Sequence, residues 1–400
     1  MAKKYLISSA FPKKGVNMDE VNKVLVRGVE KVLPSKKELA DLMRKRKITL
    51  YQGFDPSMPS LHLGNFAGLM KLRQFQKLGH KVIFLVGDFT GMIGDPDKKT
   101  TRVQLTREQT LKNSEKWKDQ VAKVLDLDGV NPAEIKFNSE WNDKITYKEL
   151  IEITSKFTVQ QMLERDLFQK RIKEKIPIHL HEFLYPVTQA IDSIKMVPDG
   201  VDLEIGGSDQ LFNILAGREL MRAVHHKEKY VLTTKLLVDK NGDKVGKTTG
   251  NALFLDSTPE NFYGGVMTFP DETIALSFEL LTECSLDGIE KAVKKDSLSE
   301  KKRLAFEIVK LLWGETSAIS AQQSFEKTFQ KKSPEFKKEI SARKTLAQTI
   351  SQVIGSVSEA KRLISQGAVD VSGTTIFDPT REITSGEEIK IGKKIFIKVK

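Results

Sequence analysis

The fold is decided by the stretch Tyr51-Gln-Gly-Phe-Asp55-Pro-Ser-Met-Pro-Ser-Leu-His62-Leu-Gly64-Asn65. Residues 48–54 are mostly apolar, aromatic or β-branched and predict a strand, which the prolines that follow bring to an end. From Leu63 onward apolar residues recur near helical spacing, so we expect a helix to begin there. A strand that leads through a turn into a helix is typical of anion sites, because the first helical N–H groups carry a partial positive charge. His62 is expected at that helix end, and Gly64 lets a flat ligand approach the backbone closely.

The composition is that of a globular chain with excess positive charge. Its 400 residues suggest two or three domains, and no apolar run approaches the roughly 20 residues that span a bilayer, so no membrane partner is expected. The N-terminus lacks the apolar segment of a targeting peptide and Cys284 is the sole cysteine, which together favour a reducing, cytoplasmic location. The net charge of +12 favours a polyanionic partner such as nucleic acid, although a lysine-rich surface that only confers solubility explains it equally well.

Strands and helices alternate over about the first 235 residues. Residues 81–86 form a continuous apolar run, which is typical of a buried parallel strand, and a loop with three glycines follows them. Residues 201–205 and 230–234 are further strand candidates, and the first of these leads into Gly206-Gly207-Ser208-Asp209-Gln210. The alternation predicts an α/β fold with a mainly parallel sheet. Since ligands of such sheets bind beyond the carboxyl ends of the strands, we expect the glycine-bearing loops to meet there.

The domain organisation follows from changes in this pattern. We expect an α/β domain over residues 1–255, with an N-terminal helical extension in which apolar residues recur every four positions from Val21 to Leu33. Helices dominate residues 256–333. Residues 340–400 predict a small basic α+β domain, with a helix that begins at a capping box and a hairpin near the end of the chain.

A second loop, Asp239–Asn251, is rich in lysine and glycine. Lys244 and Lys247 lie three residues apart with Thr248 after them, so the loop can wrap a polyphosphate with ammonium groups and inward-facing backbone N–H groups. A flexible surface hairpin explains the same composition. The loop does not match the nucleotide-binding P-loop, because no glycine stands five positions before Gly246.

Taken together, the two stretches resemble the signatures of the class I aminoacyl-tRNA synthetases. His62-Leu-Gly-Asn65 is similar to the first signature, and Lys244-Val-Gly-Lys247-Thr248 to the second in its tyrosyl form. Further segments resemble bacterial tyrosyl-tRNA synthetases: Gly53-Phe-Asp55-Pro, Gly91-Met-Ile-Gly94-Asp95-Pro96, Tyr185-x-x-x-Gln189-x-x-Asp192 and Gly206-Gly-Ser-Asp209-Gln210. The resemblance covers nearly the whole chain. It implies a Rossmann-like catalytic domain, a helical domain on the anticodon side of tRNA and a C-terminal S-four-like RNA-binding domain.

The resemblance also implies three sets of site residues, of which the first two overlap. The catalytic set is His62, Asn65, Lys244, Lys247 and Thr248. The ATP-binding set is Gly53, Asp55, His62, Gly64, Asn65, Gly207, Asp209 and Lys247. The tyrosine-binding set is Tyr51, Thr90, Asp95, Tyr185, Gln189, Asp192 and Gln210. Basic residues at 98, 99 and 102 are expected to assist from a mobile loop.

Each assignment has a plain structural alternative. Tyr185, Gln189 and Asp192 share one helical face, and the resemblance pairs Asp192 with Tyr51 on the substrate's phenolic hydroxyl. Asp192 and Asp209 are also residues that cap helices. Asn65 replaces the second histidine of the usual signature; its amide still donates a hydrogen bond but carries no charge.

The resulting expectation is a tyrosine–tRNA ligase whose partners are L-tyrosine, ATP, tRNA(Tyr) and a second copy of the chain. Mg²⁺ is expected on ATP and not in a protein-bound site, because the histidines show no metal-ligand spacing. Two alternatives remain open at this point. A tryptophanyl-type enzyme is compatible with Asn65, and a synthetase-like RNA-binding protein that has lost catalysis is compatible with the charge.

Overall fold

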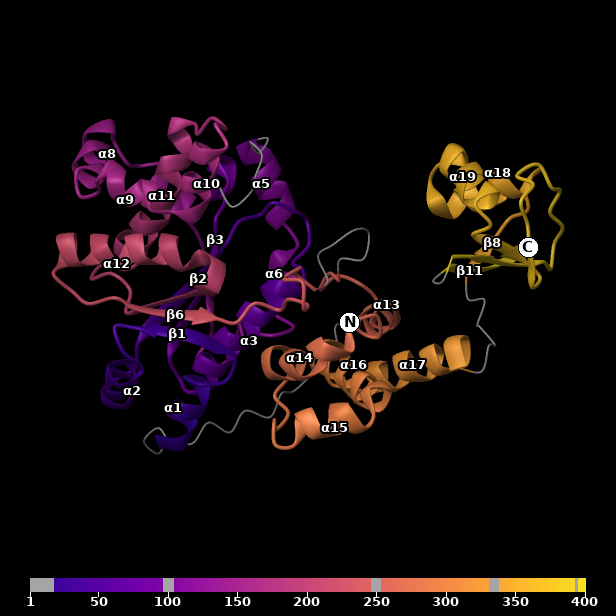
Figure 1. Cartoon of the computed structure of the whole chain (residues 1–400), viewed down its shortest axis with the longest axis horizontal. Coiled ribbons are helices and arrows are strands. Elements are labelled where there is room, and N and C mark those ends of the chain that lie inside the picture. The colour runs from indigo at the N-terminus through magenta and orange to yellow at the C-terminus, as the bar shows by residue number, and fades with distance from the viewer. Residues whose placement is uncertain (1–17, 96–103, 246–252, 331–337, 393–394) are drawn as a thin grey trace. The chain divides into compact units, whose positions relative to one another are not determined.

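The computed structural model describes residues 18–95, 104–245, 253–330, 338–392 and 395–400. Contacts divide the chain into two compact units, Met1–Ala318 and Ile319–Lys400 (Figure 1). Residues 256–318 therefore belong to the first unit, and a separate helical domain over 256–333 stays a prediction. Among the helices of the described ranges, none has the length and apolar character required to cross a membrane.

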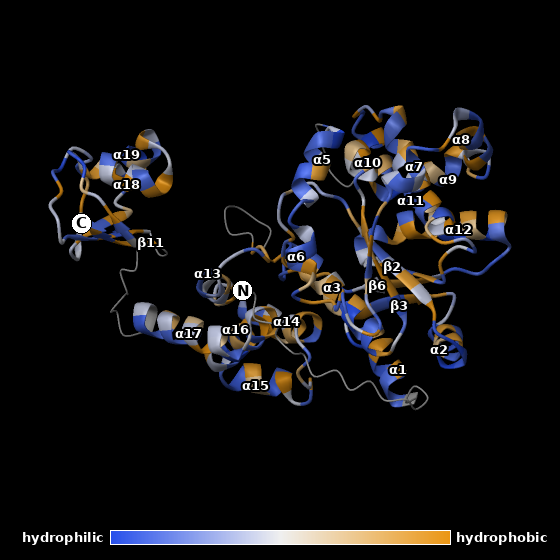
Figure 2. Cartoon of the chain, turned by 180° about the vertical axis from the view of Figure 1, so that it is seen from behind, coloured by the Kyte–Doolittle hydropathy of each residue, from blue (hydrophilic) through white to orange (hydrophobic). Residues whose placement is uncertain are grey.

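The first unit is built on a six-stranded sheet with the order β1-β6-β5-β2-β3-β4. The strands are β1 Val29–Leu33, β2 Thr49–Phe54, β3 Lys81–Val86, β4 Glu134–Phe137, β5 Leu203–Gly207 and β6 Tyr230–Thr234. All neighbours pair in parallel except β1 and β6, so the predicted α/β fold with a mainly parallel sheet is confirmed. The central strands β2 and β3 are largely hydrophobic (Figure 2), as burial on both faces of the sheet requires.

Helices surround this sheet. Those of the α/β part are α1 Met18–Val24, α2 Lys36–Lys45, α3 Leu63–Lys77, α4 Thr90–Ile93, α5 Arg107–Ser114, α6 Trp117–Val121, α7 Ser139–Asn142, α8 Tyr147–Thr154, α9 Val159–Leu163, α10 Asp166–Lys173, α11 Leu180–Lys195 and α12 Leu211–His225. Those that follow are α13 Pro259–Val266, α14 Ile274–Leu281, α15 Ile289–Lys295, α16 Ser297–Trp313 and α17 Glu315–Phe325. The long helices α11 and α12 lie side by side (Figure 1), and their buried faces join Tyr51, Ile83 and Leu85 of the central strands in one apolar core.

The expected helical extension is wrong for residues 29–33. Val29–Leu33 forms β1, although the repeat from Val21 continues through it. Gly28, at φ +65°, turns the chain out of the helical path, and the edge of β6 then offers unpaired N–H and C=O groups to whatever segment lies beside it. Pairing along that edge outweighs the periodicity. The flanking segments Met18–Val24 and Lys36–Lys45 are helices, as expected.

The second unit contains the end of α17, a five-stranded sheet and the helices α18 and α19. Its strands, in the order β7-β11-β10-β8-β9, are β7 Lys338–Ile340, β8 Val369–Val371, β9 Thr374–Thr375, β10 Glu388–Ile391 and β11 Ile395–Val399. The helices α18 Leu346–Ile354 and α19 Val357–Ser365 cover a core of small and branched apolar side chains. The predicted α+β architecture and the terminal hairpin between β10 and β11 are confirmed.

Candidate active site

A cavity of about 250 Å³ opens at the carboxyl ends of β2, β3, β5 and β6. Every predicted catalytic or ligand-binding residue that the structure describes lines this cavity. Lys247 and Thr248, together with Lys98, Lys99 and Arg102, lie outside the described residues. The cavity has a buried end, defined by Tyr51, Asp192 and Glu204, and an open end, defined by Asp209 and Lys244.

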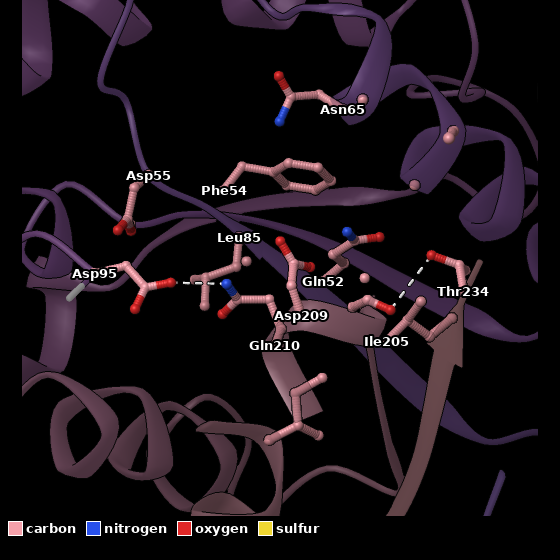
Figure 3. A pocket seen from close by; sticks show the side chains of 18 of the residues that line it. Gln52, Phe54, Asp55, Asn65, Leu85, Asp95, Ile205, Asp209, Gln210 and Thr234 are labelled. Atoms are coloured by element: carbon pink, nitrogen blue, oxygen red, sulfur yellow. Dashed lines mark hydrogen bonds between the residues drawn. The ribbon is translucent and has the colours of Figure 1, made fainter. Parts of the chain in front are cut away.

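The start of α3 forms one wall. His62 is its N-cap: Nδ1 accepts from the N–H of Asn65 (3.3 Å), and the N–H of His62 donates to Asn65 Oδ1 (2.9 Å). With Nδ1 accepting, the ring proton sits on Nε2. Asn65 directs its amide nitrogen toward the cavity (Figure 3). A Cβ at Gly64 would lie 2.9 Å from the His62 ring, so the glycine keeps the space that the imidazole occupies.

Asp55, in the turn after β2, holds two hydroxyl groups. Thr90 Oγ1 donates to Oδ1 (2.7 Å) and the Tyr185 hydroxyl donates to Oδ2 (2.8 Å). Burial, together with Asp55 and Asp95 nearby, raises the pKa of Tyr185 well above its usual value, so this hydroxyl stays protonated. A Cβ at position 87 would meet Asp55 Oδ1 at 2.2 Å, which explains the glycine at the end of β3.

Asp95 is held between an amide and a guanidinium group. Gln210 Nε2 donates to Oδ2 (2.7 Å), a bond visible in Figure 3, and Arg165 donates to Oδ1 (2.7 Å). Arg165 is 8% exposed and its guanidinium lies 5.9 Å from the rings of Phe168 and Phe212. Arg165 was missed at the level of sequence, because it lies on no recognisable motif.

Asp192 of α11 is surrounded by N–H donors. Trp141 Nε1 (2.8 Å) and Asn142 Nδ2 (3.2 Å) donate to Oδ1, and Asn138 Nδ2 (3.3 Å) donates to Oδ2. Burial nevertheless raises the pKa of Asp192 from 3.8 to about 8, against the opposing effect of the three donors. The alternative that Asp192 merely caps a helix does not describe these contacts.

Tyr51 belongs to a buried polar network at the same end. Its hydroxyl lies 2.9 Å from Ser193 Oγ, and Ser193 Oγ accepts from the Lys229 ammonium group (2.8 Å). Lys229 also forms an ion pair with Glu204, whose other oxygen accepts from Gln189 Nε2 (2.9 Å). Glu204 and Lys229 were missed, although an acidic residue in the middle of a predicted strand of a mainly parallel sheet is itself a signal that a partner must exist.

The open end has a different character. Asp209, just after β5, accepts from Lys244 Nζ at 2.7 Å, and both side chains are partly exposed. Asp209 points into the centre of the cavity (Figure 3), and the helix start beside it has no side-chain cap, so the capping alternative is not observed. A Cβ at Gly207 would lie 2.5 Å from Asp209 Oδ1.

This arrangement can bind a ligand that carries a positive group at one end and negative groups at the other. Asp55 and Asp95 provide anionic groups near the middle of the cavity, whereas the N-terminus of α3 and Lys244 provide positive potential toward its mouth. Among the described residues, no group of three or more His, Cys, Asp or Glu side chains is arranged to hold a metal ion.

Comparison with known proteins agrees with this geometry. Residues 43–330 match the family model of class I tRNA synthetases (W and Y). The chain is 38% identical to the tyrosine–tRNA ligase of Oleidesulfovibrio alaskensis, over 96% of this chain and 99% of that one. It is 40% identical to the tyrosine–tRNA ligase of Aquifex aeolicus, over 95% and 98%. A solved mitochondrial tyrosyl-tRNA synthetase from Coccidioides posadasii has a similar fold, with TM-score 0.64, 24% identity and coverage of 76% and 91%.

Proposed function

The chain belongs to the class I tRNA synthetases of the tryptophan and tyrosine type, and within them to the tyrosine–tRNA ligases; from this premise we propose that its cavity activates L-tyrosine with ATP and passes it to tRNA(Tyr). The observation that carries the proposal is the buried end. There Tyr51 and Asp192, which are 1% and 2% exposed, line the same cavity with a hydroxyl and a carboxyl group. A phenol both donates and accepts one hydrogen bond, and these two groups supply an acceptor and a donor.

Tyrosine binds with its ring toward that end. Its hydroxyl donates to Asp192 and accepts from Tyr51. Phenylalanine would remove one hydrogen bond from each of these two buried groups, which costs about 1–3 kcal/mol for each. The α-ammonium group lies at Asp95, Tyr185 and Gln189. Thr90 and Gln210 support this subsite, since Thr90 bonds Asp55 and Gln210 bonds Asp95.

ATP occupies the open end. Gly53 and Gly64 let the nucleotide approach the backbone, and Asp55 lies beside the adenylate. Gly207 and Asp209 face the ribose, where the carboxylate accepts from both hydroxyls once Lys244 leaves it. Lys244, with Lys247 and Thr248, then binds the pyrophosphate portion, and Mg²⁺ enters on the phosphates as part of the substrate.

The chemistry consists of two displacements. The carboxylate of tyrosine attacks the α-phosphate, the bond to pyrophosphate breaks, and tyrosyl-adenylate remains. The Nε2–H of His62 and the amide of Asn65 donate to the phosphate oxygens as negative charge grows on them. The 3′-terminal ribose hydroxyl of tRNA then attacks the carbonyl carbon, and AMP leaves. No covalent bond to the protein is required, so positioning and charge stabilisation supply the acceleration.

The proposal extends to partners and location. The net charge of +12 supports binding of tRNA through its phosphates, and we propose that the second unit contributes to it as an S-four-like domain. Large apolar side chains are exposed on consecutive helices from α8 to α11: Tyr147, Ile151, Val159, Ile172 and Leu180. Exposed apolar side chains on neighbouring elements of the chain support a homodimer. Sedimentation equilibrium should then give a dimer for the native chain and a monomer for Leu180→Asp. The expected location is the cytoplasm.

The test is ATP–pyrophosphate exchange with tyrosine, tryptophan and phenylalanine. We expect exchange with tyrosine, and its loss in Lys247→Ala. Exchange with tryptophan alone would assign the cavity to the other amino acid of this family. Absence of exchange with all three amino acids, alongside retained RNA binding, would identify a synthetase fold that only binds RNA.

A further inference from the structure

We infer that Lys229 and Ser193 fix the direction of the hydrogen bond through which Tyr51 recognises the substrate's phenolic hydroxyl. They are positioning residues for amino-acid specificity, and neither lines the cavity. The inference rests on the proposed function, because it concerns the subsite for the phenol.

The first step is the burial of the charged pair. Side-chain exposure is 0% for Lys229 and 2% for Glu204, and they lie beneath Tyr51, whose ring centroid is 6.0 Å from the Lys229 ammonium nitrogen. A buried ion pair is a poor source of stability, since apolar residues of similar volume commonly serve as well or better. The pair therefore calls for another explanation, and its contacts supply one.

The second step is the count of donors and acceptors at Ser193. Its hydroxyl has one hydrogen and can accept on the oxygen, whereas an ammonium group can only donate. Lys229 donates to Ser193 Oγ at 2.8 Å, so the serine hydrogen must go elsewhere. Two acceptors are within reach: the Tyr51 oxygen at 2.9 Å and Glu204 Oε2 at 3.4 Å. The shorter contact is favoured, and Glu204 already accepts from Lys229 and Gln189.

The third step follows at Tyr51. Because its oxygen accepts from Ser193, its own hydrogen is left for an acceptor at the cavity wall, where Glu204 lies and where the substrate's phenolic oxygen competes with it. The substrate's phenolic oxygen then accepts from Tyr51, and the phenolic hydrogen goes to Asp192. Each bond in this series polarises the next, and the series begins at a charged donor in a region without solvent.

An independent observation supports this network. Gly217 lies inside α12, where a glycine is about 1 kcal/mol less favourable than alanine. A Cβ there would lie 2.4 Å from Lys229 Nζ and 2.6 Å from Ser193 Oγ. Position 217 thus leaves room for the ammonium group and the hydroxyl, which a methyl group would force apart.

The same pair reaches the other end of the amino-acid site. Glu204 holds Gln189 by its Nε2, and among the described residues Gln189 Oε1 is buried with no hydrogen-bond partner. An acceptor left in this state suits the α-ammonium group. One buried pair therefore orients the groups that meet both polar ends of tyrosine.

The test uses Ser193→Ala and Gly217→Ala in the full-length chain. Each variant removes or displaces the donor to Tyr51 without changing a side chain that lines the cavity. The measured quantity is kcat/KM for tyrosine and for phenylalanine in ATP–pyrophosphate exchange. The matched control is Gly264→Ala, since that glycine lies in another helix and a Cβ there meets nothing within 4 Å.

We expect the tyrosine-to-phenylalanine ratio of kcat/KM to fall about tenfold in both variants, as the loss of one hydrogen bond predicts. The change should appear in KM for tyrosine, with phenylalanine and the control unaffected. A folded Ser193→Ala with an unchanged ratio, or equal losses for both amino acids, would overturn the inference. If the native chain showed no tyrosine-dependent exchange, the proposed function itself would fail instead.

Discussion

Two lysine–carboxylate pairs lie at opposite ends of one cavity and differ in almost everything but their chemistry. Lys229 and Glu204 have side-chain exposures of 0% and 2%, whereas Lys244 and Asp209 have 42% and 33%. The first pair is linked to Ser193 and through it to Tyr51. The buried Lys229–Glu204 pair therefore has a structural role at the site, whereas the exposed Lys244–Asp209 pair can exchange its partners.

The physical reason is solvation. Removing one member of a buried pair leaves an uncompensated charge, at a cost of about 3–5 kcal/mol, while an exposed pair contributes about 0–1 kcal/mol. Under the proposed function, tyrosine would thus meet a preformed subsite. ATP would meet a subsite whose carboxylate is paired with Lys244, and moving Lys244 from Asp209 to phosphate would cost little.

The largest effect is expected when the buried pair is broken. Lys229→Met should lower the free energy of unfolding by about 3–5 kcal/mol, because Glu204 is left charged and buried. Urea denaturation measures this change. Lys244→Met is the matched control at the open end and should cost no more than about 1 kcal/mol. Similar costs for both variants would remove the distinction between the two pairs.

For catalysis, in contrast to stability, the exposed pair is expected to matter more than the buried one. Lys244→Met should lower kcat for tyrosine activation by about 100-fold, as is typical when one donor to a developing charge is lost. Its dissociation constant for tyrosine should not change, because the amino-acid end keeps its contacts. Single-turnover kinetics and tyrosine titration separate the two quantities. A weakened tyrosine affinity with normal kcat would contradict this prediction, because it would assign Lys244 to tyrosine binding and not to the reaction at ATP.

A pH-dependent effect concerns the charge at Asp192. Its pKa is 3.8 in an ordinary setting and about 8 in the folded chain, so the folded state binds more protons between these values. The native chain therefore loses stability as pH rises from about 4 to about 8, by at most about 1.4 kcal/mol per pH unit. Asp192→Asn removes this slope.

Urea midpoints at about pH 5 and about pH 8 should differ more for the native chain than for Asp192→Asn. The variant should also lose its preference for tyrosine over phenylalanine. If stability depended on pH equally in the native chain and in Asp192→Asn, Asp192 would already be ionised at about pH 5. The three N–H donors would then lower its pKa more than burial raises it.

Sequence reasoning reached the open end more readily than the network behind the buried one. Asp55, Asp209 and Lys244 stand in loops that follow strands, so their convergence could be predicted from the parallel sheet alone. Lys229 and Glu204 belong to no motif and meet only because β5 and β6 are neighbours. The same holds for Arg165, which is 70 residues from its partner Asp95. Pairing of this kind is decided by tertiary packing, which local sequence pattern does not encode.

The smallest expected effect is the coupling between Lys244 and Asp209 in the absence of ATP. A double-mutant cycle with Lys244→Met and Asp209→Asn should give a coupling free energy below about 1 kcal/mol in urea denaturation. It should decline between about 0.05 M and about 0.5 M NaCl, because salt screens exposed charges. A coupling of several kcal/mol that resists salt would mean that ATP must break a strong contact. The Lys244–Asp209 pair would then be as strong as the buried Lys229–Glu204 pair, and the distinction between the two ends of the cavity would be lost.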